Sequence, residues 1–308
     1  MARYLWCAML ASACLAMANT ASAVSETTRG MSSRHPRYPA WGNLTAFFGI
    51  TYMPEAAIEA ALKEETQGAV RLLPISDDLL PAPLRQRPAG TRPILVELGT
   101  QNSAGVTHLP ITHRMHREAK IMFPHVQVSG RDGQTRSTNT GSNIWNYHHV
   151  EWADRSMVCY ASKMLYGARC KRPFGQIVDK PPMFQLLRRN VLEGHRSALL
   201  NADIQPWDNV SDDDWNRTYR LVRQWLDMPW TAGHGKRWAR HRYMLPSQAG
   251  WQPMRAKLYM TPDFLKMEPN MGGAQLGDSY TVYGATFSTE WNVTWPSKVN
   301  DLLPYSSA

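Results

Sequence analysis

An apolar stretch at the start of the chain restricts compartment and architecture more than any other feature. No charged residue falls between Arg3 and Glu26, and residues 4–24 form a run of 21. About 20 apolar residues span the core of a bilayer, so this length suits a transmembrane helix. With Arg3 before it and Ala21-Ser22-Ala23 at its end, the stretch also suits an export signal cut before Val24. We predict a retained membrane anchor over residues 1–24, with the cleaved signal as the alternative.

The next segment, residues 25–53, lacks the pattern of a regular helix or domain. Pro36 and Pro39 exclude a regular helix around them. Residues 25–40 are rich in Ser and Arg, as in an organelle transit peptide, but the preceding apolar block is not an Arg-striped amphipathic helix. Residues 41–53 are apolar and aromatic yet too short to span a membrane. We interpret 25–53 as an extended linker that ends in an apolar aromatic segment.

Residues 54–308 are interpreted as one globular α+β domain with irregular Pro-rich connections. The whole chain is 43% hydrophobic, which is ordinary for a folded protein with a core. The best helix start is Ser211, where a capping serine precedes three aspartates. Apolar periodicity and turn residues predict helices over about 54–68, 154–166, 183–195 and 211–228. Alternation or short apolar runs predict strands over 69–75, 93–99, 121–128 and 281–295.

The positive charge is concentrated in two places. The chain has a net charge of +9, and residues 101–200 hold 14 Lys or Arg against 6 Asp or Glu. The most basic window is 233–243, which interleaves cations with aromatic rings. Such a window suits anionic lipid or an acidic protein surface, and nucleic acid is disfavoured because no binding-module signature is present. The residues expected to contact lipid or a partner are Lys236, Arg237, Trp238, Arg240, Arg242 and Tyr243.

Histidines provide the one candidate for a metal site. His113 and His116 are three residues apart, a spacing that can place both rings on one helical face, and Glu118 lies nearby. A second pair, His148 and His149, precedes Glu151. No H-E-x-x-H pattern occurs, and chance clustering of histidines is the main alternative. These four histidines are the candidates if the protein is a His-dependent metalloenzyme.

Two cysteines lie outside the apolar stretch, Cys159 and Cys170. They would form one small disulfide loop in an oxidising compartment and remain thiols in a reducing one. Neither belongs to a C-x-x-C pair, which argues against a thiolate zinc site. Four N-x-S/T sequons, at Asn43, Asn209, Asn216 and Asn292, could carry glycans only in a secretory lumen.

No motif in the chain names a reaction or a cofactor. The anchor, the Arg and aromatic content and the absent motifs predict a non-catalytic accessory subunit of a membrane assembly, with the other subunits as its partners. We expect a mitochondrial inner-membrane complex of the respiratory chain or ATP synthase, although no residue specifies that membrane. The alternatives are a secreted or periplasmic binding protein or glycoprotein, and the His-dependent metalloenzyme.

Overall fold

The computed structural model describes residues 40–106, 109–138, 142–173, 175–189, 196–273, 276–277 and 279–305. The anchor or signal expected over residues 1–24 and most of the expected linker, up to residue 39, lie outside the described residues. Within the described ranges, every helix is too short or too polar to cross a bilayer.

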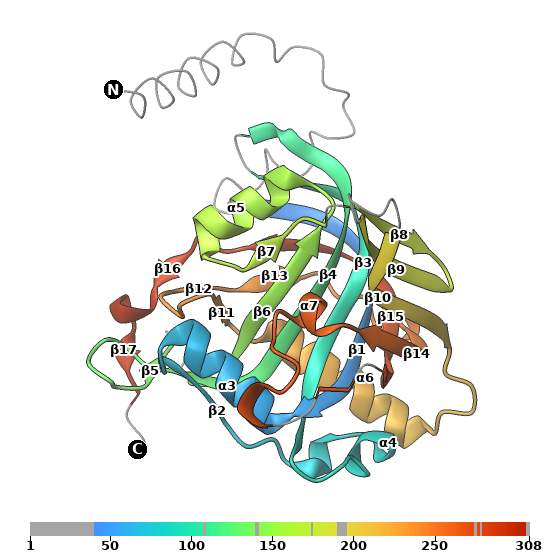
Figure 1. Ribbon diagram of the computed structural model, residues 1–308, viewed down its shortest axis with the longest axis horizontal. Helices are drawn as coiled ribbons and strands as arrows, with labels where there is room; N and C mark the ends of the chain where they lie inside the picture. The colour runs from blue at the N-terminus through green and yellow to red at the C-terminus, as the bar shows by residue number, and fades with distance from the viewer. Residues whose placement is uncertain are drawn as a thin grey trace. The chain divides into compact units, whose positions relative to one another are not determined.

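Strands make up most of the described chain (Figure 1). They differ widely in length, and the longest ones lie at the centre of the sheet. In chain order they are β1 (Ala40–Pro54), β2 (Val70–Leu72), β3 (Thr91–Val106), β4 (Leu109–Val128), β5 (Arg136–Ser137), β6 (Trp145–Ala153), β7 (Cys170–Lys171), β8 (Gln176–Lys180), β9 (Met183–Arg189), β10 (Arg196–Pro206), β11 (Trp230–Ala232), β12 (Arg237–Ala239), β13 (His241–Tyr243), β14 (Gln252–Met260), β15 (Ser279–Val293), β16 (Ser297–Lys298) and β17 (Leu303–Pro304).

Fifteen of these strands form one sheet. Its order is β16-β12-β11-β6-β4-β3-β1-β15-β14-β10-β9-β8, with β13 on β15, β2 on β4 and β7 on β6. Neighbours are antiparallel except that β6 runs parallel to β7 and β11. Strands β5 and β17 pair separately. Strands distant in sequence, such as β1 and β15, therefore lie side by side at the centre of the sheet.

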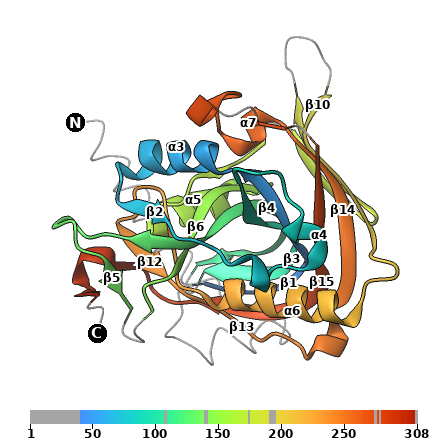
Figure 2. The ribbon, with the colours of Figure 1, turned by 90° about the horizontal axis from the view of Figure 1, so that it is seen from below.

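Helices lie on both sides of the central strands. They are α3 (Glu55–Thr66), α4 (Ala82–Arg85), α5 (Ser156–Tyr166), α6 (Asp212–Asp227) and α7 (Pro262–Leu265), with single 3-10 turns η2 (Asp77–Leu79), η3 (Gln248–Gly250), η4 (Met271–Gly273) and η5 (Val299–Asp301). Figure 2 shows α3 and α6 on opposite sides of these strands. Each side has its own hydrophobic core: Phe123 packs with α3, whereas the next-door Met122 packs with α6. This split follows from strand geometry, because successive side chains point to opposite faces.

The fold class predicted from the sequence, a mixed α+β domain, is wrong. One large sheet of fifteen strands organises the domain. The helix expected over 183–195 is also wrong where it can be checked. Residues 183–189 form strand β9, in which Phe184 and Leu186 are buried at a period of two. Cross-strand pairing with β8 and β10 overrides the helical pattern there. Residues 41–53 lie in β1, between β3 and β15.

Other local predictions are confirmed. Helices α3, α5 and α6 occupy three of the four expected helical segments. The Ser211 hydroxyl caps α6 by accepting a hydrogen bond from the backbone N–H of Asp214. The alternating segment 281–295 corresponds to β15, whose Tyr283, Ala285 and Phe287 contribute to one core. Of the sequon asparagines, Asn292 is buried and so is closed to glycan attachment in the folded chain.

The expected mitochondrial inner-membrane location is corrected by the same structure. That location depended on a membrane-spanning helix within residues 1–24, which lie outside the described residues, and on a folded domain that covers a neighbouring subunit. The described ranges hold one large sheet with helices on both faces, and no helix in them could cross a bilayer. The expectation of a respiratory-chain or ATP-synthase setting has no structural support.

A disulfide joins Cys159 of α5 to Cys170 of β7. The disulfide links α5 to β7, the strand that pairs with β6, and both cysteines are buried together with Ala153. This is the pairing expected in an oxidising compartment.

Breaking this disulfide should destabilise the domain. The two cysteines are 11 residues apart in sequence, and the chain entropy of so short a loop corresponds to about 3 kcal/mol. We expect the double variant Cys159→Ser/Cys170→Ser to lose about this much unfolding free energy in urea denaturation. Reducing the wild-type protein should produce the same loss and should not affect the variant. A wild-type curve that ignores reductant would contradict the prediction.

Candidate active site

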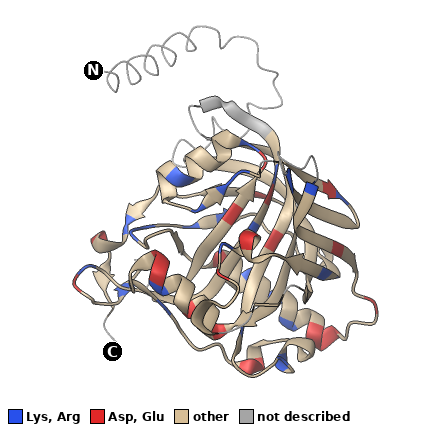
Figure 3. Ribbon diagram, viewed as in Figure 1, with Lys and Arg blue, Asp and Glu red and all other residues tan. Residues whose placement is uncertain are grey.

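Three ionisable residues share one face of β4. His116, Glu118 and Lys120 are spaced by two, so their side chains point to the same side of the strand, and all three are buried. The intervening Ala119 and the following Ile121 point into the opposite core. Charged residues accordingly lie within the central strands as well as at the surface (Figure 3). Buried charges need partners, so the neighbouring strands must supply them.

Lys120 is surrounded by carboxylates. Its Nζ lies 3.0 Å from Oε1 of Glu97, which is opposite on β3, and 3.0 Å from Oε1 of Glu118. Glu151 is opposite on the other side, on β6. Burial lowers the pKa of Lys120, but these three carboxylates outweigh burial and raise the pKa well above its ordinary value. Lys120 is therefore a buried ammonium in the resting protein.

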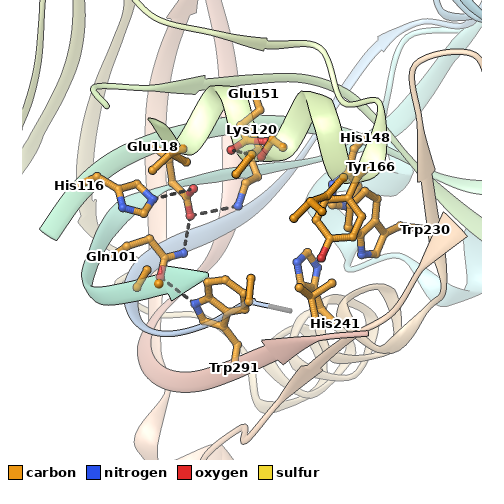
Figure 4. Close-up of a pocket in the computed structure, with 18 of the residues that line it drawn as sticks. Gln101, His116, Glu118, Lys120, His148, Glu151, Tyr166, Trp230, His241 and Trp291 are labelled. Carbon is orange, nitrogen blue, oxygen red and sulfur yellow. Dashed lines mark hydrogen bonds and ion pairs between the residues drawn. The ribbon is translucent and has the colours of Figure 1, made fainter. Parts of the chain in front are cut away.

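A chain of hydrogen bonds fixes Glu118. Nε2 of Gln101 donates to its Oε1 at 2.5 Å, and Nε1 of Trp291 donates to Oε1 of Gln101 at 2.7 Å. Nε2 of His116 lies 3.7 Å from Oε2 (Figure 4). Burial raises the pKa of Glu118, but Lys120 and His116 outweigh it and hold the pKa well below its usual range. Glu118 is thus the carboxylate that remains ionised beside Lys120.

The other two carboxylates are easier to protonate. Burial raises the pKa of Glu97 to about 8, with Lys120 opposing and Glu118 adding to the shift. Burial also raises the pKa of Glu151, again against Lys120. Ser162 Oγ lies 3.4 Å from Oε1 of Glu151. The cluster therefore combines one cation, one firmly ionised carboxylate and two basic carboxyl groups, a set that can move protons near neutral pH.

Aromatic rings form the other end of the site. His148 stacks on Trp230 with 4.2 Å between ring centroids and 5° between planes, and His241 lies 5.2 Å from Trp230 at 21°. Burial lowers the pKa of both histidines, and nearby positive groups lower it further; the value for His241 is about 3. Both rings are therefore neutral at physiological pH. The ring centroids of Tyr166 and Trp230 are 5.0 Å apart.

Helix α5 closes the space between these two ends (Figure 4). The cavity has a volume of about 100 Å³, and a single buried water needs roughly 10–15 Å³. A small organic molecule therefore fits with one end at Lys120 and the other at the rings. The side chains that α5 contributes are Met157, Val158, Ala161, Ser162, Leu165 and Tyr166.

Replacing Glu97 should change how stability depends on pH. Its pKa is higher in the folded state, about 8, than the roughly 4.3 of an unfolded glutamate. Folding therefore binds a proton between these values, and stability falls as pH rises through that window, by up to about 1.4 kcal/mol per pH unit. We expect Glu97→Gln to flatten this fall in urea denaturation between pH 5 and 8. The exposed Glu268→Gln should follow the wild-type slope, and parallel slopes in all three proteins would disprove the assignment.

The four histidines proposed as metal ligands are not brought to one point. His116 and His148 both line the cavity. His149 points to the opposite face, where Nε2 lies 2.6 Å from the carbonyl oxygen of Leu265. The side chain of His113 is outside the described part, but its backbone is extended in β4, so helical spacing does not apply. In the described ranges no three His, Cys, Asp or Glu side chains gather around a possible metal position.

The basic window 233–243 is divided among several roles. Arg237 donates to the carbonyl oxygens of Met164 and Leu165, and Arg240 donates to that of Asp227. These two side chains cap the C-terminal turns of α5 and α6. The remaining members differ in exposure: Lys236 and Arg242 are exposed, Trp238 is half-buried against Trp145, and Tyr243 lines the cavity. A lipid or partner contact at this window stays a prediction.

The sequence analysis missed Lys120, Glu97, His241 and Trp230, and it named Glu118 and Glu151 only as neighbours of histidines. One available signal was the spacing of two between His116, Glu118 and Lys120, which would place three ionisable side chains on one face of a strand. The helical interpretation of His113 and His116 concealed this alternation.

Comparison with known proteins identifies only distant likenesses. No family model and no curated protein sequence matches the chain. Among solved structures it is similar to acetoacetate decarboxylase from Legionella pneumophila, at 10% identity over 87% of this chain and 90% of that one, with a TM-score of 0.45. It is also similar to the enduracididine biosynthesis enzyme MppR (11%, 92% and 94%, 0.41) and to an acetoacetate decarboxylase-like enzyme from Sphingomonas wittichii RW1 (9%, 90% and 98%, 0.40). Likenesses this distant transfer neither a reaction nor a residue role.

The residues around the cavity correct the expectation of a non-catalytic accessory subunit. The chain buries a lysine, carboxylates and histidines around a cavity, which is costly for a purely structural domain. Clusters of buried ionisable groups with shifted pKa values are typical of functional sites.

Proposed function

We propose that this protein is an enzyme that joins Lys120 to a small carbonyl compound as an imine. The observation that carries the proposal is a buried primary amine at the wall of a cavity, within hydrogen-bond distance of two carboxylates. Lysine amines form Schiff bases with carbonyl substrates in enzyme active sites. Lys120 is the one Lys or Arg among the described residues that line the cavity.

The charge of Lys120 is compatible with this chemistry. One proton leaves the ammonium for Glu97, the more basic of the two carboxyl groups that lie 3.0 Å from Nζ, and the free amine attacks the carbonyl carbon. A carbon–nitrogen bond forms while the carbonyl oxygen takes up that proton. Transfer of a second proton from nitrogen to oxygen releases water and leaves an iminium that retains one N–H. Ammonium and iminium have the same charge, so the ion pair with Glu118 stabilises both the resting enzyme and the intermediate.

The groups around the iminium suit a reaction at the carbon atom next to it. An iminium withdraws electrons from the adjacent carbon, so a bond at that carbon breaks with its electron pair delocalised towards nitrogen. Glu151 has a raised pKa and lines the cavity beside Lys120, which suits it to accept a proton from that carbon. We therefore assign the protein to enzymes that break or make bonds next to a carbonyl group.

Reductive trapping tests this proposal. The folded protein is incubated with propanal and cyanoborohydride at pH 7, and the modified lysines are identified by peptide mass spectrometry. Hydride adds to the iminium carbon and converts the imine into a stable secondary amine. We expect Lys120 to be modified in a saturable way and faster than exposed lysines such as Lys257. Modification of Lys120 no faster than that of Lys257 would contradict the proposal.

A further inference from the structure

We propose that the substrate of this site is an uncharged carbonyl compound with a flat apolar body, and not a keto acid or another carboxylate. This inference rests on the proposed imine chemistry of Lys120. It follows from the distribution of charge and of aromatic surface around the cavity.

Among the residues whose side chains the structure describes, the cavity offers a carboxylate no free positive charge. Lys120 already lies 3.0 Å from both Glu97 and Glu118. Glu118 and Glu151 line the same cavity, so acidic side chains outnumber the single cation among the described lining residues. A second anion would have to compete with Glu118 for Lys120 and would be repelled by it in a poorly solvated space.

The histidines of the cavity do not supply the missing charge. Burial lowers the pKa of His148 and of His241, and His241 would become charged only near pH 3. His116 lies 3.7 Å from Glu118, so any charge on His116 would be engaged by that carboxylate. An anionic substrate therefore finds only groups that are neutral or already paired.

The end of the cavity away from Glu118 suits a flat apolar group. The rings of His148 and Trp230 are almost parallel, and Tyr166 and Trp291 add further aromatic wall (Figure 4). Helix α5 faces them with apolar side chains such as Leu165. Aromatic rings pack in offset-stacked or edge-to-face arrangements at centroid distances of about 4.5–7 Å. A conjugated or aryl aldehyde or ketone can thus place its carbonyl at Lys120 and its body among these rings.

The size of the space agrees with a molecule of this kind. The cavity volume is about 100 Å³, the same order as the roughly 150 Å³ engineered cavity that holds benzene. One ring with a short carbonyl arm is therefore of the same order of size as this space.

Three aldehydes of one scaffold separate charge from size: benzaldehyde, 4-formylbenzamide and 4-carboxybenzaldehyde. The amide has nearly the shape of the carboxylate but no charge. Each is titrated against the folded protein with cyanoborohydride at pH 7, and the half-saturating concentration for modification of Lys120 is measured. We expect the half-saturating concentration of 4-carboxybenzaldehyde to be at least about 10-fold higher than that of 4-formylbenzamide. Exposed lysines in the same digest, such as Lys257, report any difference in intrinsic reactivity.

A matched aliphatic aldehyde tests the flat apolar body. Butanal should need a higher concentration than benzaldehyde, because it lacks a ring to pack against Trp230. Equal or better modification by the carboxylate than by the amide would overturn the charge argument while leaving imine formation at Lys120 intact. Preference for butanal would overturn the ring argument alone. Failure of every aldehyde to modify Lys120 faster than Lys257 would instead remove the proposed function itself.

The variant Glu151→Gln gives a further readout of charge. It removes one acidic side chain from the cavity wall while keeping its size. Discrimination between the amide and the carboxylate should then shrink several-fold, even if the overall rate of trapping falls. Unchanged discrimination would contradict the contribution of Glu151 to the charge argument.

Discussion

Replacing Lys120 with arginine will abolish reductive trapping at position 120 and reduce turnover to the rate without enzyme. Arginine keeps the positive charge that Glu97 and Glu118 require, but its guanidinium does not form an imine with a carbonyl. The adjacent cavity leaves room for the longer side chain. The measurement is peptide mass spectrometry after incubation with benzaldehyde and cyanoborohydride, together with the urea denaturation curve of the variant.

The variant Lys120→Met separates the chemical role of the residue from its structural role. Methionine removes both the nucleophile and the charge, so three buried carboxyl groups are left without a cation. Removing one partner of a buried ion pair costs about 3–5 kcal/mol. We expect Lys120→Met to be that much less stable than Lys120→Arg, with neither variant trapped. A variant Lys120→Arg that turns over substrate at a wild-type rate would exclude imine catalysis.

Replacing Glu118 with glutamine will move the pH profile of trapping. Glu118 is among the carboxylates that raise the pKa of Lys120, and an opposite charge at this distance changes a pKa by about 1–3 units. The rise in trapping rate with pH should therefore shift to lower pH by about that amount.

A control for this variant lies directly after β6. Asp154 forms an ion pair with Arg117 at 3.4 Å and does not line the cavity. Asp154→Asn removes an ion-paired carboxylate outside the cavity, and its pH profile should coincide with the wild type. If Glu118→Gln also coincides with the wild type, Glu118 does not control the proton on Lys120.

Local chemistry alone was enough to predict several elements. The serine cap at Ser211 with its three aspartates specifies the start of α6, because the cap satisfies a backbone N–H within one turn. Gly167 ends α5 in the left-handed conformation that glycine adopts without strain. The alternation over residues 281–295 is enough to predict a strand, and β15 forms there. Each signal arises between residues close in sequence, so the sequence contains all the information that the element needs.

The same local reasoning failed where pairing partners decide the conformation. Residues 183–189 have apolar side chains that fit a helix or a strand, and only β8 and β10 on either side select the strand. The spacing of His113 and His116 suggested a helix, whereas the β3–β4 pairing holds that segment extended. Because the neighbouring strands were unknown, a helical period was assigned to both segments, although both are strands.

The sequence by itself determined the local elements: helix caps, the alternation of β15, and a pair of cysteines able to bridge. Only the tertiary structure decided the site. Glu97, Lys120 and Glu151 are separated by more than twenty residues each, and they meet because β3, β4 and β6 are neighbours in one sheet. The charge state of each residue depends on its neighbours in the cluster, because ionisable groups a few ångströms apart in poorly solvated space shift each other's pKa. The separation of these residues along the sequence does not reveal that they are close together in the folded protein.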